Sequence, residues 1–126
     1  MNPRSQAVLV VDDDRSIRFL CRVNLELDGW QVLEAATLAE ARNQIAEGDV
    51  DLVLVLLDLH VGAGRGLDLL AELRAVRPDV PVALLTGSAE APAEAGADAV
   101  ISKPFTLDEL RETVHSLVAR RARSAG

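Results

Sequence analysis

Residues 52–66 read LVLVLLDLHVGAGRG, an apolar run that ends in Asp58 and continues into a glycine-rich segment. A short run that is apolar at every position is typical of a strand buried on both faces, as the strands of parallel sheets are. Because burying an unpartnered carboxylate is costly, we expect Asp58 at the open carboxyl end of its strand. Ligands of open α/β sheets bind at that edge. The sequence therefore predicts that Asp58 is the reactive group of a site there.

The rest of the chain alternates apolar strands with amphipathic helices. This alternation predicts parallel strands joined by right-handed crossovers, which is a doubly wound α/β fold. Residues 89–98 are rich in alanine and contain Pro92, so a helix there is expected to be short or missing. The predicted strands are 7–11, 31–35, 53–57, 82–85 and 99–102, and the predicted helices are 15–27, 37–47, 67–77 and 106–119.

The first helix and the C-terminal tail carry further expectations. Asp14 or Ser16 should cap the first helix. We expect the tail from Arg120 to be frayed. One domain is predicted over residues 1–126, with its core at about 7–122 and tails at 1–6 and 123–126. The expected core-facing stripe of the first helix is Ile17, Leu20, Asn24 and Leu27 with Phe19 and Val23 beside it, and its expected solvated arginines are Arg15, Arg18 and Arg22.

Composition narrows the possible functions. A chain of 126 residues that is 49% hydrophobic fits one packed domain. A net charge of -7 and only three aromatic residues argue against nucleic-acid binding. No apolar run has the length of a membrane span, and no signal-peptide core follows the N-terminus. The single cysteine, Cys21, suits a reducing compartment. We expect a cytoplasmic protein that contacts neither nucleic acid nor a membrane.

Polar side chains follow three further predicted strands. Asp12 and Asp13 follow the first, Thr86 the fourth and Lys103 the fifth. A cluster of these carboxylates with Asp58 needs a cation, and hard oxygen ligands favour Mg²⁺ over zinc. A metal, a hydroxyl and an ammonium around one aspartate are what phosphoryl transfer to a carboxylate requires. The sequence thus predicts that Asp58 accepts a phosphoryl group.

Four motifs occur in order: VLVVDDD at 8–14, LVLLDL at 54–59, LLTGS at 84–88 and ISKPF at 101–105. Together they resemble the receiver domain of bacterial response regulators, over about residues 7–122. The resemblance implies a flavodoxin-like sheet of five parallel strands in the order 2-1-3-4-5, with helices on both faces. It also implies a cis peptide bond before Pro104. The site residues that it implies are Asp58 as phosphoacceptor, Asp12, Asp13, Asp58 and the backbone carbonyl of His60 as ligands of Mg²⁺ (or Mn²⁺ in its place), and Thr86 and Lys103 as contacts of the phosphoryl oxygens.

The resemblance also implies partners. The phosphodonor would be a phosphohistidine on a histidine kinase or a histidine phosphotransfer protein, and a separate target protein would read the signal. The chain would be a monomer or a weak dimer, and it would be a switch rather than a metabolic enzyme, catalysing only its own phosphorylation and dephosphorylation.

The sequence departs from the family pattern in three places. Val100 stands where an aromatic residue is usual, the segment between Thr86 and Lys103 is short, and the loop after Asp58 carries Gly62 and Arg65 in place of a proline and an aspartate. Three glycines in that loop suggest mobility. An alternative is therefore a pseudo-receiver that binds its partner independently of phosphorylation. A third possibility is a Mg²⁺-dependent phosphatase, against which the short chain and His60 two positions after Asp58 both argue.

Overall fold

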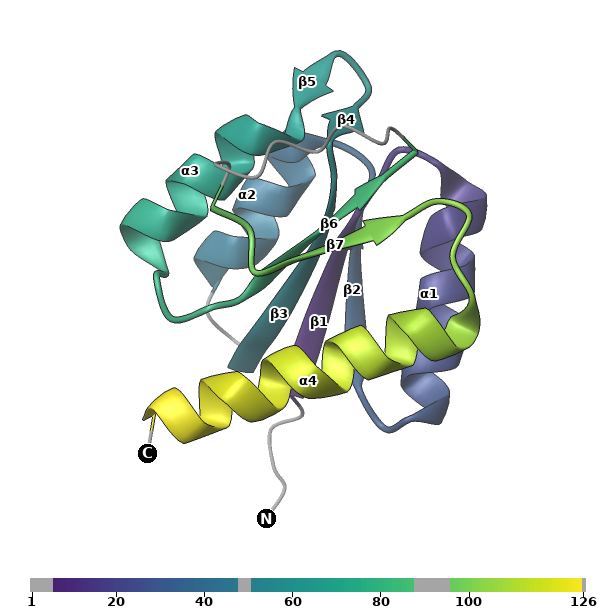
Figure 1. Cartoon of the computed structure of the whole chain (residues 1–126). Helices are drawn as coiled ribbons and strands as arrows, with labels where there is room; N and C mark the ends of the chain where they lie inside the picture. Colours follow the sequence, from purple (N-terminus) through teal and green to yellow (C-terminus); the bar gives the residue numbers. More distant parts are fainter. Residues whose placement is uncertain (1–5, 48–50, 88–95, 126) are drawn as a thin grey trace.

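The computed structural model describes residues 6–47, 51–87 and 96–125. Its main sheet has five parallel strands in the order β2-β1-β3-β6-β7, which confirms the predicted flavodoxin-like arrangement (Figure 1). The strands are β1 (Gln6–Val11), β2 (Gln31–Ala35), β3 (Asp51–Asp58), β6 (Val82–Thr86) and β7 (Ala99–Ser102). The helices are α1 (Arg15–Leu27), α2 (Leu38–Glu47), α3 (Gly66–Val76) and α4 (Leu107–Ala125).

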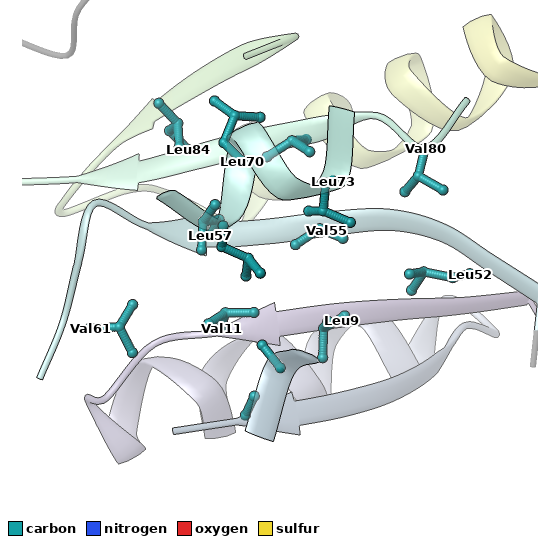
Figure 2. Close-up of a cluster of buried hydrophobic side chains, with 14 of the residues drawn as sticks. Leu9, Val11, Leu52, Val55, Leu57, Val61, Leu70, Leu73, Val80 and Leu84 are labelled. Atoms are coloured by element: carbon teal, nitrogen blue, oxygen red, sulfur yellow. The ribbon is translucent and has the colours of Figure 1, made fainter. Parts of the chain in front are cut away.

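Two hydrophobic clusters, one on each face of the sheet, form the core. Because successive residues of a strand point to opposite faces, Leu9 packs in the cluster under α2 and α3, whereas Val10 packs in the cluster under α1 and α4. Figure 2 shows the first cluster, in which Leu57 of β3 lies near Leu70 and Leu84. All six residues from Leu52 to Leu57 are buried, so β3 is the doubly covered strand that the sequence predicts.

Side-chain caps fix where three helices begin. Asp14 accepts from the backbone N–H of Ser16 at 2.9 Å and so begins α1. A threonine caps α2 and another caps α4: Thr37 Oγ1 accepts from Glu40 N, and Thr106 Oγ1 accepts from Glu109 N, each at 3.0 Å. At α4 the Glu109 carboxylate also accepts from Thr106 N, which completes a capping box. Since α1 follows β1 after only three residues, Asp12 and Asp13 are held at the strand's carboxyl end.

The predicted apolar stripe of α1 is wrong except at Ile17. The buried face consists of Cys21 and Leu25, with Ile17 partly buried one turn earlier, whereas Phe19 is 66% and Leu27 80% exposed. Apolar residues surround this helix on several sides, so more than one stripe satisfies the helical period. The decisive residue is Cys21, which packs as a small hydrophobe.

The arginines of α1 are only partly a solvated face. Arg18 is mostly buried: its Nη1 donates to the backbone oxygen of Asp12 at 2.8 Å, and its Nε donates to Glu34 of β2 at 3.1 Å. Arg22 donates to the other oxygen of Glu34. The half-buried carboxylate in β2 draws both guanidinium groups to the sheet, and this corrects the expectation for Arg18.

A small hairpin follows β3 in the segment for which the sequence predicts a mobile loop. Its antiparallel strands are β4 (His60–Val61) and β5 (Gly64–Arg65). Gly62 has φ +60°, which is the conformation of the first central residue of a type II′ turn. The hairpin lies beyond the carboxyl ends of the main-sheet strands (Figure 1).

The C-terminal helix is longer than predicted. It continues to Ala125 rather than fraying from Arg120. Arg121 pairs with two carboxylates near the amino ends of β3 and β6. Its Nη2 lies 3.3 Å from Asp79 and 3.6 Å from Asp51, and these ion pairs hold the end of the helix against the sheet. The expected short or missing helix at 89–98 falls largely on residues 88–95, which lie outside the described residues.

Candidate functional site

Three carboxylates meet at the carboxyl edge of the sheet. Asp12 and Asp13 follow β1, and Asp58 ends the adjacent strand β3. One oxygen from each of these side chains lies within 4.8 Å of the other two. Asp12 is fully buried, Asp58 is partly buried and Asp13 is exposed, so the cluster opens to solvent on one side. The structure thus brings together the three aspartates that the sequence singled out.

Lys103 supplies a cation to this cluster. Its Nζ lies 2.8 Å from Asp12 Oδ2 and 3.4 Å from Asp58 Oδ2. The lysine follows β7, and its backbone N–H donates to the carbonyl of Thr86 at 2.7 Å. The Lys103–Pro104 peptide bond is cis, as predicted.

Thr86 lies at the same edge. It is the last residue of β6 and is 3% exposed. Its neighbour Leu85 pairs in register with Asp58, so Thr86 stands one position beyond the phosphoacceptor candidate on the adjoining strand.

The charges of the site perturb one another. Burial, and next the charge of Asp12, raise the pKa of the Asp58 carboxyl above its ordinary value, although the charge of Lys103 opposes them. For Lys103, burial alone would lower the pKa, but the hydrogen bond to Asp12 and the two carboxylate charges outweigh it and raise the pKa. Lys103 is therefore held as an ammonium. Beneath the site, burial raises the pKa of the Cys21 thiol to about 12, so this thiol is inert.

Backbone groups of the hairpin tie it to the carboxylates. The N–H of Gly62 donates to Asp13 Oδ2 at 2.9 Å, and the N–H of His60 is 3.3 Å from Asp58 Oδ1. The His60 side chain is exposed. The sequence pattern did not identify Gly62 as a contact of the site. A glycine in a two-residue connection between strands was the signal available for it.

Two further residues missed by sequence reasoning support the site from behind. Arg18 holds the carbonyl of Asp12. A Cβ added to Gly66 would overlap the backbone oxygen of Asp58, so only glycine fits where α3 begins against the end of β3. For Arg18, the available signal was its position one helical turn after Asp14. For Gly66, no local pattern marks its contact with the end of β3.

The residues fit a hard divalent cation. Carboxylate oxygens from Asp12, Asp13 and Asp58 converge, and the exposed side of the cluster leaves room for water or substrate oxygens. Mg²⁺ prefers a few carboxylates together with waters and phosphate oxygens. Of the side chains described by the structure, these three form the only cluster of potential metal ligands.

Comparison with known proteins gives the family. The model of the "Response regulator receiver domain" matches residues 8–115, which is most of the chain. The chain belongs to the response regulator receiver family. This confirms the resemblance carried by the four sequence motifs, which lie at the carboxyl ends of β1, β3, β6 and β7.

Relatives of this receiver chain are response regulators. It is 36% identical to the transcriptional regulatory protein PrrA of Mycobacterium tuberculosis over 126 residues, covering 96% of this chain and 53% of PrrA. It is 38% identical over 123 residues to the KDP operon transcriptional regulatory protein KdpE of Escherichia coli, covering 94% and 52% of the two chains. The receiver chain thus spans about half the length of these relatives.

Solved receiver structures share the fold. The crystal structure of a CheY-like response regulator receiver domain protein from Methanospirillum hungatei has a TM-score of 0.85 and 29% identity, and the match covers 95% of this chain and 98% of that one. In the part of the receiver chain that the structure describes, no helix has both the length and the apolar character needed to cross a bilayer.

Proposed function

We propose that this receiver chain is a phosphoacceptor switch, in which Asp58 receives a phosphoryl group from a phosphohistidine. The donor would be a histidine kinase or a histidine phosphotransfer protein. The observation that carries the proposal is the position of Lys103 Nζ, which lies between a buried carboxylate, Asp12, and the partly exposed carboxylate of Asp58. That placement orients an ammonium toward the space in which a phosphoryl group on Asp58 would lie.

The proposed transfer uses the chain's own groups in defined roles. An oxygen of ionised Asp58 attacks phosphorus in line, the P–N bond of the phosphohistidine breaks, and the imidazole leaves with the bonding electrons and takes a proton from solvent. Lys103 and the Thr86 hydroxyl would each meet a phosphoryl oxygen and stabilise charge there. Asp12, Asp13, Asp58 and the His60 carbonyl would hold Mg²⁺, which when bound would neutralise the carboxylates and the phosphoryl oxygens.

The phosphorylated form would differ in its affinity for a separate target protein, because a switch biases an equilibrium between conformations. The same site would hydrolyse the acyl phosphate and reset the switch. That this chain interacts with a histidine kinase or phosphotransfer protein, and with a separate target protein, is part of the proposal. So is the absence of nucleic-acid contact, since the relatives named as transcriptional regulators are about twice as long.

Intact mass spectrometry tests the proposal. The native chain and Asp58→Asn are incubated with acetyl phosphate and Mg²⁺, with and without EDTA. We expect the native chain to gain one phosphoryl group only when Mg²⁺ is available, and Asp58→Asn to gain none. No gain in the native chain, or an equal gain in the variant, would defeat the proposal. If phosphorylation occurs but a captured target binds native chain and Asp58→Asn equally, the pseudo-receiver alternative is favoured.

A further inference from the structure

The β4–β5 hairpin has one face toward the core and one toward solvent. Val61 is 3% exposed and packs in the core cluster under α2 and α3. Its cross-strand partner is Gly64, where an added Cβ would lie 2.7 Å from the Leu38 side chain of α2. Directly paired residues share a face, and successive residues alternate. The other pair, His60 and Arg65, therefore lies on the solvent face, and both side chains are exposed.

The hairpin is held beside the phosphoacceptor candidate at both ends. The N–H of His60 is 3.3 Å from Asp58 Oδ1, and at the other end Gly66 is packed directly against the backbone oxygen of Asp58. Arg65 is the residue before Gly66, and consecutive Cα atoms are about 3.8 Å apart. Arg65 pairs with His60, and paired Cα atoms of antiparallel strands are about 4.5–5.5 Å apart, so the Cα of Arg65 lies within about 10 Å of the Asp58 carboxylate. The flexible, exposed side chain can place the guanidinium at a similar distance, which is the screening length at moderate salt.

Local structure does not explain an arginine at this position. Arg65 is the N-cap of α3, where Ser, Thr, Asp or Asn would accept a backbone hydrogen bond, but a guanidinium has no acceptor. A cation is also disfavoured by the helix dipole at this end. Among the side chains that the structure describes, that of Arg65 has no hydrogen bond or ion pair. Within the described residues, the position therefore forgoes cap stability without a hydrogen bond or an ion pair in return.

We propose that Arg65 is a specificity-determining residue that attracts anionic phosphodonors to Asp58 and favours dianionic over monoanionic phosphoryl groups. The inference rests on the proposed phosphoacceptor function. An incoming phosphoryl group meets a chain of net charge -7 and a site with three carboxylates. An unpaired guanidinium at the solvent rim offsets that repulsion along the approach to the site.

Coulomb's law gives the size of the effect. At about 10 Å in water, a unit positive charge raises the local concentration of a monoanion about twofold and that of a dianion about fourfold at low salt. Reversing the charge doubles the exponent, so Arg65→Glu should slow capture of a dianion by about 15-fold relative to the native chain. All these factors should fall toward one near 1 M salt, where the screening length is about 3 Å.

The experiment measures the second-order rate constant for phosphorylation of Asp58 by intact mass, with acetyl phosphate as the dianionic donor and phosphoramidate as the monoanionic donor. Arg65→Gln and Arg65→Glu are compared with Arg120→Gln. Arg120 is an exposed arginine on α4, whose C-terminal end lies across the molecule from the hairpin (Figure 1). Arg120→Gln therefore makes the same change in net charge as Arg65→Gln, but far from the hairpin.

We expect Arg65→Gln to lose about fourfold with acetyl phosphate and about twofold with phosphoramidate at low salt, and Arg120→Gln to match the native chain. Equal rates for Arg65→Gln and Arg120→Gln, or equal losses with both donors that persist at high salt, would overturn the role of Arg65 while leaving Asp58 as phosphoacceptor. If the native chain takes no phosphoryl group from either donor, the proposed function itself fails, and the inference fails with it.

Discussion

Replacing Lys103 with methionine removes the cation of the site and keeps the length of the side chain. Without Mg²⁺, this substitution leaves the Asp12 carboxylate, which is 0% exposed, without the ammonium that lies 2.8 Å from it. It also removes the ammonium that lies 3.4 Å from Asp58 Oδ2, so the charge of Asp12 acts on Asp58 without it. Both effects destabilise the folded state.

The expected magnitude follows from the burial of the pair. Breaking a fully buried ion pair costs about 3–5 kcal/mol. Lys103 is 21% exposed and Asp13 faces solvent, so water screens part of this, and we expect a loss of about 1–3 kcal/mol. For a domain of this size that loss lowers the melting temperature by about 4–12 °C.

Mg²⁺ should largely restore the stability of Lys103→Met, since a divalent cation replaces the missing charge. Removing a unit positive charge about 5 Å from the ion, even at the dielectric of water, should tighten Mg²⁺ binding by about 1.7 kcal/mol, or more than tenfold in Kd. The native chain should also gain stability with Mg²⁺, but its melting temperature should rise less and only at higher concentrations of the ion.

Thermal unfolding followed by circular dichroism, over a Mg²⁺ titration that starts in EDTA, measures both effects. Arg120→Met is the matched control, because it removes an exposed cation far from the carboxylates. A Lys103→Met chain as stable as the native chain in EDTA, or a deficit that is the same at every Mg²⁺ concentration, would refute the electrostatic account of the site.

Three further predictions concern packing and the surface. Gly66→Ala should cost about 1–3 kcal/mol in denaturant unfolding because its Cβ overlaps a backbone oxygen, whereas Gly87→Ala, with no atom within 4 Å of the added Cβ, should be nearly neutral. Leu25→Ala should cost about 2–5 kcal/mol and Leu27→Ala almost nothing, and equal costs would contradict the observed face of α1. The bidentate hydrogen bonds from Arg111 lower the pKa of Asp28, so Asp28→Asn should reduce the melting temperature at neutral pH. The difference should begin to shrink near the ordinary carboxyl pKa of about 3.9 and disappear only as the pH falls through the lowered pKa of folded Asp28.

The apolar runs were sufficient to predict the parallel strands and the residues at the carboxyl edge of the sheet, whereas the order of the strands came from the family resemblance. Continuous apolar runs identify buried parallel strands, and a polar residue directly after such a run has to lie where the strand leaves the core. This reasoning placed Asp12, Asp58, Thr86 and Lys103 together without any knowledge of contacts, because parallel strands end at one edge.

The face of α1 and the role of Arg18 were not predictable from local patterns. Periodicity alone cannot choose between stripes when apolar residues occur on several sides, and the choice depends on what the sheet presents to the helix. Glu34 lies half-buried in β2, and only the three-dimensional pairing of β2 with β1 shows that it attracts Arg18. Both errors arise from tertiary contacts overriding a local interpretation.

The hairpin and the end of α4 illustrate a different limit. Two-residue strands are too short to have a periodic signal, so the glycines around β4 and β5 predicted a mobile loop. At the C-terminus, small and basic residues predicted fraying. Arg121 nevertheless pairs with Asp51, the first residue of β3, and with Asp79, which lies three residues before β6. Contacts between residues far apart in the sequence decided both outcomes.

The most direct test of the central claim is to locate the acyl phosphate on the chain. After incubation with acetyl phosphate and Mg²⁺, borohydride reduces an aspartyl phosphate to homoserine, which peptide mass spectrometry can assign to a single position. We predict homoserine at position 58, with Asp12, Asp13 and every other aspartate intact and no conversion in EDTA. Conversion at another carboxylate, or none at Asp58 in chain that has gained a phosphoryl group, would contradict Asp58 as the phosphoacceptor.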